Sequence, residues 1–258
     1  NIWSSELAKL TSNAFLAQRI SSINTISAIC EVTGADVREV SRAIGKDTRI
    51  GSKFLDSGPG FGGSCFKKDI LNLVYLAEYF GLNEVATFWE SVVQVNSWHK
   101  RRIAEIVVKK LFGTVANKKL VILGFAFKAN TNDTRESAAI QICKDLIEEG
   151  AELIIHDPKV DPNQIAIDLG LHPIELIKDT NRKIFEGGWK FSREIYESFN
   201  GVDACLILTE WEDYSNIDWM KASKIMRRPA WVFDTRLIAD KKKINEANLS
   251  FWRLGDGS

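Results

Sequence analysis

The sequence predicts an α/β fold in two parts. Residues 1–112 form an all-helical domain that ends in a long connecting helix, and residues 113–258 form a doubly wound parallel sheet. In the first part, apolar residues recur at three- and four-residue steps, as on buried helical faces. In the second part, short β-branched runs alternate with helical patterns, as in βαβ units. The 258 residues, 45% of them hydrophobic, can bury a substantial core.

Four helical patterns make up the first part. The first follows Ser4 and Ser5, which can cap a helix, and glycines end the others. The last pattern runs to Gly113, which gives a helix of roughly 40 Å. Because apolar residues lie on more than one of its faces, we expect it to join two domains or to form a subunit interface. The patterns cover about 4–30, 37–44, 67–80 and 83–112.

The second part begins with a strand, a helix and a strand within about 40 residues, so these strands should be parallel and the domain Rossmann-like. We expect the stretch 161–190 to be less regular and to hold an insertion. The predicted strands are 119–124, 152–157, 204–208 and 231–234, and the predicted helices are 137–149, 193–199 and 219–225.

The charge balance excludes several classes of function. Lys+Arg 34 equals Asp+Glu 34, and the charges are interspersed, so we expect neither a nucleic-acid partner nor a membrane surface. The four cysteines are far apart, and with three histidines they predict no metal site and a reducing, cytoplasmic compartment. The chain opens at Asn1 directly in a helical pattern, which indicates a fragment whose beginning is missing.

The run from Gly58 to Gly63 formally satisfies the dinucleotide fingerprint G-x-G-x-x-G. That fingerprint requires a preceding strand inside a βαβ unit, whereas the flanks here are helical. Three interpretations remain: a pyrophosphate loop, an ordinary glycine-rich turn, or a loop whose backbone NH groups approach a ligand closely. The sequence favours the third.

Cys65 follows this loop at the start of a helix, with lysines nearby. Unpaired NH groups and the helix dipole favour a thiolate there, which is a nucleophile. A single cysteine is more often a small buried hydrophobe, and we interpret the other three that way. Lys9 and Asn13 share one helical face, which is either solvated surface or, if it meets the cysteine loop, part of a site.

The first strand of the second part leads into Phe127 and Lys128, and Asp133 to Ser137 lead into the next helix. Polar and basic residues thus lie at the carboxyl edge of the parallel sheet, where such folds bind nucleotides. The fingerprint glycines are mostly absent, so both a specialised nucleotide site and a purely structural turn stay open.

Three segments, 6–15, 60–69 and 124–137, resemble the nucleotide-sugar dehydrogenase family, most closely its members that act on UDP-glucose. The resemblance implies an N-terminal NAD-binding domain, a helical domain that dimerises through its long helix, and a UDP-binding domain. This chain matches the last two, so we expect a fragment that is inactive alone. A relative acting on GDP-mannose or a UDP-N-acetyl hexosamine, and a non-catalytic nucleotide-sugar-binding dimerisation module, are the alternatives.

The resemblance also implies the reaction and its residues. NAD would oxidise UDP-glucose twice to UDP-glucuronate, through a thiohemiacetal and a thioester on Cys65. The expected partners are the UDP-sugar substrate and further copies of the chain, as a homodimer or higher homo-oligomer. The implied catalytic residues are Cys65, Lys9, Asn13 and Asp69; the substrate contacts are Arg49, Phe54, Gly62, Phe127, Lys128 and Arg236; the NAD contacts are Lys68 and Arg135.

Two positions depart from the family pattern. Lys67 stands where relatives have Pro or Gln, which should favour the thiolate further. Thr235 stands between Asp234 and Arg236 where the family has glycine, so the loop that presents Arg236 could differ.

Overall fold

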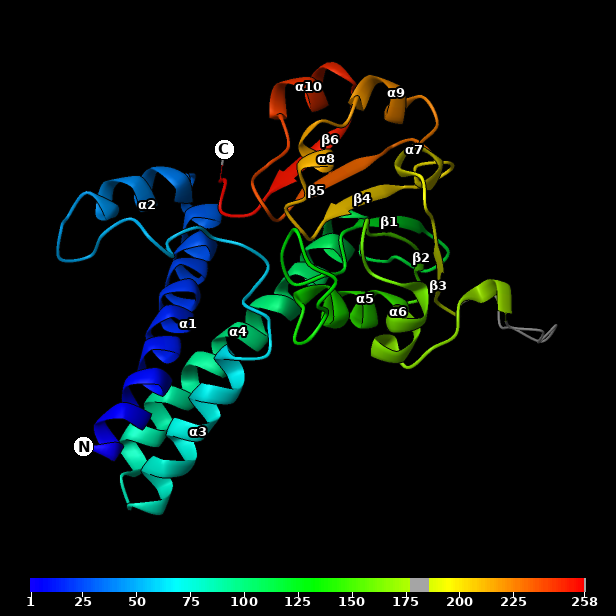
Figure 1. Ribbon diagram of the computed structural model, residues 1–258. Helices are drawn as coiled ribbons and strands as arrows, with labels where there is room; N and C mark the ends of the chain where they lie inside the picture. The colour runs from blue at the N-terminus through cyan, green and yellow to red at the C-terminus, as the bar shows by residue number, and fades with distance from the viewer. Residues whose placement is uncertain (177–185, 258) are drawn as a thin grey trace. The chain divides into compact units, whose positions relative to one another are not determined.

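The computed structural model describes residues 1–176 and 186–257. The chain divides into two compact units, Asn1–Lys100 together with the tail from Leu254, and Arg101–Arg253 (Figure 1). The predicted α/β class is confirmed, because a helical first part is followed by one parallel sheet. Helix α4 (Asn83–Lys110) passes from the first unit into the second.

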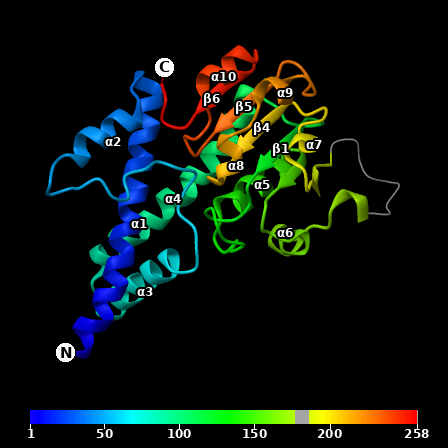
Figure 2. The same cartoon turned by 45° about the horizontal axis from the view of Figure 1, so that its top comes forward.

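The helical unit is built from α1 (Ile2–Thr33), α2 (Val37–Gly45), α3 (Phe66–Tyr79) and the first part of α4, so the four predicted helices are confirmed. Helix α1 begins earlier than predicted, because the side chain of Asn1 rather than of a serine caps it, accepting from Ser4 N at 2.9 Å. Helices α1, α3 and α4 lie side by side (Figures 1 and 2). They enclose a core of Ala14, Ala17, Phe61, Ile70, Leu73, Val74, Ala77, Ala86 and Val92.

The C-terminal tail belongs to this helical unit. Val37 N donates to Gly255 O at 2.8 Å, and Gly257 N donates to Ala35 O at 3.0 Å, so the tail is hydrogen-bonded to the turn between α1 and α2. Gly255 has φ 71°, and a Cβ there would lie 2.4 Å from the Val37 side chain. A glycine is therefore required at this close approach.

In its described residues, the second unit contains six parallel strands in the order β3-β2-β1-β4-β5-β6. This is the order of a doubly wound sheet, in which the winding direction changes between β1 and β4. Most side chains of the strands are buried, as expected of parallel strands covered on both faces. The strands are β1 (Lys119–Leu123), β2 (Glu152–His156), β3 (Gly188–Phe191), β4 (Ala204–Ile207), β5 (Trp231–Asp234) and β6 (Ser250–Arg253).

Helices cover both faces of this sheet. Helices α5 (Ala138–Glu148) and α6 (Pro162–Leu169) lie on one face, and α9 (Trp219–Ser223) and α10 (Lys241–Glu246) lie on the other (Figures 1 and 2). The short helices η1 (Ile174–Leu176), α7 (Ile195–Ser198) and α8 (Glu212–Ser215) complete the unit. Among the described residues, none of the helices is both long and apolar enough to cross a bilayer.

The stretch 161–190 is more regular than expected. It contains α6, η1 and most of the edge strand β3, and its residues 177–185 lie outside the described part of the chain. Asp161 caps α6, Pro162 stands in its first turn, and Gly170 follows it with φ 71°. These are ordinary start and stop signals of a helix. The helix is the regular crossover between β2 and β3.

Candidate functional site

Three buried side chains hold the glycine loop by its backbone. Asn24 Oδ1 accepts from Gly58 N at 3.0 Å, and a ring nitrogen of His99, Nε2, bonds Gly58 O at 2.9 Å. Asn96 bonds both the N–H and the carbonyl of Phe61, at 2.9 and 3.2 Å. Buried peptide groups need such partners when no regular structure supplies them. His99 therefore helps to fix this loop.

The setting of the loop is not that of a dinucleotide fingerprint. Residues 46–57, which precede it, form turns and irregular backbone rather than a strand, and helix α3 follows it. Gly60 has φ 128°, and a Cβ there would lie 2.9 Å from Asn96 Oδ1. Gly60 thus serves close packing of the loop against α4, and the expectation that this run is no Rossmann pyrophosphate loop agrees with the structure.

The loop delivers Cys65 to the position just before α3. Cys65 is exposed, whereas Cys30, Cys143 and Cys205 are buried. Its Sγ lies 3.7 Å from Ser64 Oγ. The unpaired N–H groups of the first helical turn and the helix dipole favour a negative charge at this end of the helix.

Asp69 lies one helical turn after the cysteine, and its N–H donates to Cys65 O at 2.9 Å. Its carboxylate is 2% exposed. Asn13 Nδ2 donates to Asp69 Oδ2 at 2.5 Å, and Lys9 Nζ lies 3.6 Å from the same oxygen. The shared face of α1 thus meets the helix of the cysteine. The cluster combines a thiol, a buried carboxylate, an amide and an ammonium group.

Arg49 and Phe54 lie elsewhere in the helical unit, on the loop after α2. The Arg49 side chain is 87% exposed and pairs with Asp47 at 2.6 Å. Hydrogen bonding from the Arg49 guanidinium lowers the pKa of the Asp47 carboxyl. Phe54 is exposed and has φ 60°, which is uncommon for an aromatic residue. Arg19 of α1 fastens this loop by donating to the carbonyls of Ile50, Gly51 and Lys53 at 2.8, 2.8 and 3.0 Å.

Phe127, Lys128 and Arg236 lie together at the carboxyl edge of the sheet, beside the change of winding between β1 and β4. Arg236 Nη2 donates to Phe127 O at 3.1 Å and its Nε donates to Leu208 O at 2.8 Å. Its Nη1 lies 3.1 Å from Glu210 Oε2. Burial lowers the pKa of the Arg236 guanidinium, and the Glu210 carboxylate opposes that change. Lys128 is exposed, and its Nζ lies 5.3 Å from the Phe127 ring centroid.

A buried carboxylate shapes the loop after β1. Asp157 Oδ2 accepts from Phe125 N at 2.7 Å and from Ala126 N at 3.0 Å. Its Oδ1 accepts from Lys159 N and Val160 N at 2.9 and 3.0 Å. In a dinucleotide site, an acidic residue in this part of the fold binds a ribose hydroxyl. Here that carboxylate is occupied by backbone N–H groups.

The residues expected to contact NAD belong to separate units. Lys68 is exposed on the first turn of α3, and Arg135 is exposed and pairs with Asp133 at 2.7 Å. Hydrogen bonding from Arg135 lowers the pKa of the Asp133 carboxyl. Neither the glycine loop nor the loop after β1 offers a pyrophosphate cradle. The described residues therefore do not by themselves fit a dinucleotide.

Sequence reasoning missed Glu210, Asn96 and Arg19. Glu210 follows the predicted strand 204–208, so the rule that placed Lys128 at the carboxyl edge could have found it. No sequence pattern of this kind marks Asn96 or Arg19. A polar residue within a helical pattern predicts a solvent-exposed face unless its tertiary partner is known.

Two domain models of one family match the chain. The central domain of the UDP-glucose/GDP-mannose dehydrogenase family matches residues 3–98, and the UDP binding domain of the same family matches residues 121–241. Together they cover well over half of the chain. The protein belongs to this family of nucleotide-sugar dehydrogenases.

The chain is similar in sequence to proteins named UDP-glucose 6-dehydrogenase. The protein of that name from Drosophila melanogaster is 49% identical over 255 residues, which are 99% of this chain and 53% of that protein. The one from Gallus gallus is 52% identical over 240 residues, 93% of this chain and 48% of that protein. The chain thus spans about half the length of these relatives. A UDP-glucose dehydrogenase structure from Pyrobaculum islandicum, 28% identical, superimposes with a TM-score of 0.76 over 98% of this chain and 51% of that chain.

The exposure of the cysteines predicts a single reactive thiol. Burial raises the pKa of the Cys30, Cys143 and Cys205 thiols, which also lack access to reagents. Brief treatment of the folded chain with iodoacetamide should therefore add one label, as read from the intact mass, and peptide mapping should place it on Cys65. Cys65→Ser should abolish native labelling, and denaturant should expose the other thiols. Native labelling of a different cysteine would contradict the burial described here.

Proposed function

We propose that this chain forms the catalytic-cysteine and UDP-binding parts of a UDP-glucose 6-dehydrogenase, which oxidises UDP-glucose to UDP-glucuronate in two NAD-dependent steps. The observation that carries the proposal is the cluster around Asp69. An exposed thiol at a helix N-terminus stands one turn from a buried carboxylate that holds both an amide and an ammonium group. Nucleophilic catalysis on a carbonyl requires these types of group close together.

In this proposal, the thiolate of Cys65 adds to the C6 aldehyde that the first oxidation forms, which gives a thiohemiacetal. The second oxidation converts it to a thioester, and water releases the carboxylate product. Lys9 and Asn13 present donors toward an oxyanion at C6, where charge develops in the transition state. Asp69 orients the attacking water and accepts a proton from it. The contacts from Asn13 and Lys9 hold the Asp69 carboxylate in place for this role.

NAD would supply the hydride acceptor for both oxidations. The described residues offer it only marginal contacts, through Lys68 and Arg135, and no pyrophosphate cradle. We therefore expect residues 1–258 alone to produce no NADH from NAD and UDP-glucose. The proposed setting is the reducing cytoplasm, with which four free cysteines are compatible.

The nucleotide is proposed to bind at the carboxyl edge of the sheet, over Phe127, Lys128 and Arg236. A guanidinium carries five N–H donors, and the contacts with Phe127 O, Leu208 O and Glu210 use three of them. Donors on both terminal nitrogens therefore remain for an oxygen of the nucleotide. Lys128 adds an exposed ammonium group for the diphosphate.

We also propose that the protein is a homodimer or a higher homo-oligomer built on α4. Val85, Phe88 and Trp98 expose 44%, 50% and 42% of their surface along the first part of this helix. Exposed apolar side chains gathered on one element indicate an interaction surface. The Arg49 loop, held rigidly by Arg19, would reach toward the sugar in the neighbouring subunit.

The cysteine mechanism predicts different outcomes for two variants of the protein at its natural length. Cys65→Ser should turn over very slowly and accumulate a covalent sugar adduct, because an ester is less reactive than a thioester. Lys9→Ala should lose about 100- to 1000-fold in turnover, the effect of one oxyanion donor, without an adduct. NADH formation and intact-mass spectrometry measure both effects.

Cys143→Ala, in the sheet unit, is the control and should retain activity. If Cys65→Ser turned over like the parent, Cys65 would not be the nucleophile. Faster oxidation of GDP-mannose than of UDP-glucose would favour the alternative substrate.

The nucleotide site can be tested on the 258-residue chain without turnover. Lys128→Ala should weaken UDP binding by about tenfold or more, since a charge-assisted hydrogen bond contributes about 1.5 to 3 kcal/mol. Titration calorimetry with UDP measures the dissociation constant. Lys144→Ala, an exposed lysine on α5, should bind UDP like the parent. An unchanged dissociation constant for Lys128→Ala would reject its assignment.

The oligomer interface predicts that Phe88→Asp yields monomers. The side chain is half exposed within one chain, so the change should leave the fold intact but place a charge in the interface, which is costly unless it is paired. Val92 is unsuitable for this test, because it is only 5% exposed and lies in the core of the helical unit. Light scattering reports the mass, with Ile167→Asp, an exposed apolar position on α6, as control. A Phe88→Asp protein with the parent's mass would place the interface elsewhere.

A further inference from the structure

A buried ion pair supports the loop that carries Arg236. We propose that Arg253, at the end of β6, is a positioning residue for nucleotide binding, which acts through Asp234 on the backbone of Arg236. This proposal rests on the proposed nucleotide site, and it adds a residue from a strand that the sequence pattern did not reveal.

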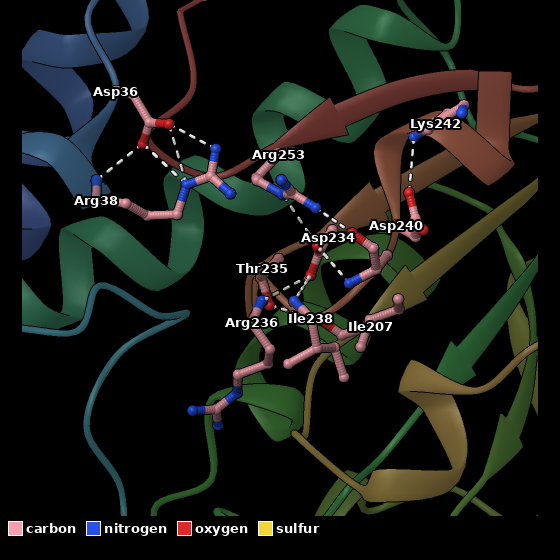
Figure 3. Close-up of polar contacts among 11 residues, drawn as sticks. Asp36, Arg38, Ile207, Asp234, Thr235, Arg236, Ile238, Asp240, Lys242 and Arg253 are labelled. Atoms are coloured by element: carbon pink, nitrogen blue, oxygen red, sulfur yellow. Dashed lines mark hydrogen bonds and ion pairs between the residues drawn. The ribbon is translucent and has the colours of Figure 1, made fainter.

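Asp234 ends β5 and gathers the following loop around its carboxylate (Figure 3). Its Oδ1 accepts from Arg236 N at 3.1 Å and from Ile238 N at 3.3 Å. Its Oδ2 accepts from Ala239 N at 3.0 Å. The carboxylate is fully buried, so the loop from Thr235 to Ala239 is shaped by this one side chain.

Arg253 is paired with Asp234 in the register of β5 and β6. Its Nε lies 3.2 Å from Asp234 Oδ2, and its Nη2 donates to Ala239 O (Figure 3). Its guanidinium carbon also lies 5.0 Å from the Phe251 ring centroid. One arginine, 6% exposed, therefore holds both the carboxylate at the start of the loop and the carbonyl at its end.

The loop needs this support. Leu237 adopts φ 59°, a conformation that a bulky residue enters only when its surroundings impose it. Thr235 Oγ1 adds a hydrogen bond of 2.6 Å to Ile207 O, which explains how a threonine replaces the glycine of the family pattern. The Thr235 hydrogen bond does not neutralise the buried charge of Asp234.

Removing Arg253 would leave a buried carboxylate without its counter-charge, a costly arrangement in a low-dielectric interior. The loop could relieve that cost by opening toward water, and Arg236 would then lose its alignment with Phe127 O and Leu208 O. The predicted result is weaker nucleotide binding, although Arg253 itself makes no contact with the nucleotide.

The same unit offers a second arginine–aspartate pair as a control. Arg227 contacts Asp203 in a bidentate pair, with Nε–Oδ1 and Nη2–Oδ2 both at 2.5 Å. Asp203 precedes β4, so this pair lies at the amino edge of the sheet, opposite the proposed nucleotide site. Asp203 Oδ2 also accepts from Lys119 N at 2.8 Å. Losing Arg227, which is 53% exposed, removes a more solvated ion pair of the same unit without touching the Asp234 loop.

The test compares Arg253→Met with Arg227→Met in the 258-residue chain. Calorimetry measures the UDP dissociation constant, and amide hydrogen exchange follows residues 235–239. We expect Arg253→Met to weaken UDP binding by about tenfold and to speed exchange in the loop. Arg227→Met should lower the melting temperature but leave both readouts at the parent values.

Unchanged UDP binding in Arg253→Met would overturn the proposal, and so would equal weakening by both variants, since Arg253 would then act only on stability. If Arg253→Met does not fold, Arg253→Lys keeps the charge but not the two-sided contact. It should bind UDP more weakly than Arg227→Lys, and equal affinities would overturn the proposal. A parent chain that binds no UDP would overturn the proposed nucleotide site itself, a result distinct from any difference between the variants.

Discussion

The loop that carries the cysteine passes through the interior of the helical unit, where no strand pairs with it. Its buried peptide groups must still be hydrogen-bonded, because a buried unpaired amide is expensive. Asn24 and His99 satisfy the two sides of Gly58, and Asn96 satisfies Phe61. These bonds fix the loop immediately before Cys65 and α3, and the first turn of the helix then sets Cys65 relative to Asp69. The chemistry proposed for the thiol thus rests on buried side chains that bind the backbone of the preceding loop.

The sheet unit solves the same problem with carboxylates. Asp157 binds the backbone of the loop after β1, and Asp234 binds the backbone of the loop after β5. A dinucleotide-binding loop instead leaves its N–H groups open for a pyrophosphate. Gly124 illustrates the difference, since its φ of 96° and its approach to Thr209 serve packing, a Cβ there falling 2.3 Å from the threonine Cβ. The nucleotide proposed for this edge would therefore be bound by side chains such as Lys128 and Arg236.

The sequence revealed the elements with strong internal patterns. The four long helical patterns and the strands β1, β2, β4 and β5 could be predicted, because buried faces repeat at helical spacing or form β-branched runs. Strands β3 and β6 could not, since polar or small residues interrupt their apolar runs: β3 begins with Gly188 and contains Lys190, and β6 ends with Arg253. An arginine in a short run does not predict burial until its partner, here Asp234, is known from the fold.

The residues of the candidate site likewise fall into those that the sequence could predict and those that it could not. The proximity of Lys9, Asn13 and Asp69 followed from helical spacing together with the family resemblance. The anchoring residues Asn24, Asn96 and Arg19 bind backbone atoms that are distant in sequence, and a hydrogen bond to a peptide group leaves no side-chain pattern. Such residues could be found only once the loops had been placed.

The C-terminal tail has a practical consequence for dividing this protein. Because Gly255 and Gly257 are bonded to Val37 and Ala35, the helical unit is discontinuous in sequence. Cutting the chain after Lys100 would leave the turn between α1 and α2 without its natural cover. An autonomous helical domain would need the last residues restored, for example by joining them through a short linker as in a circular permutation.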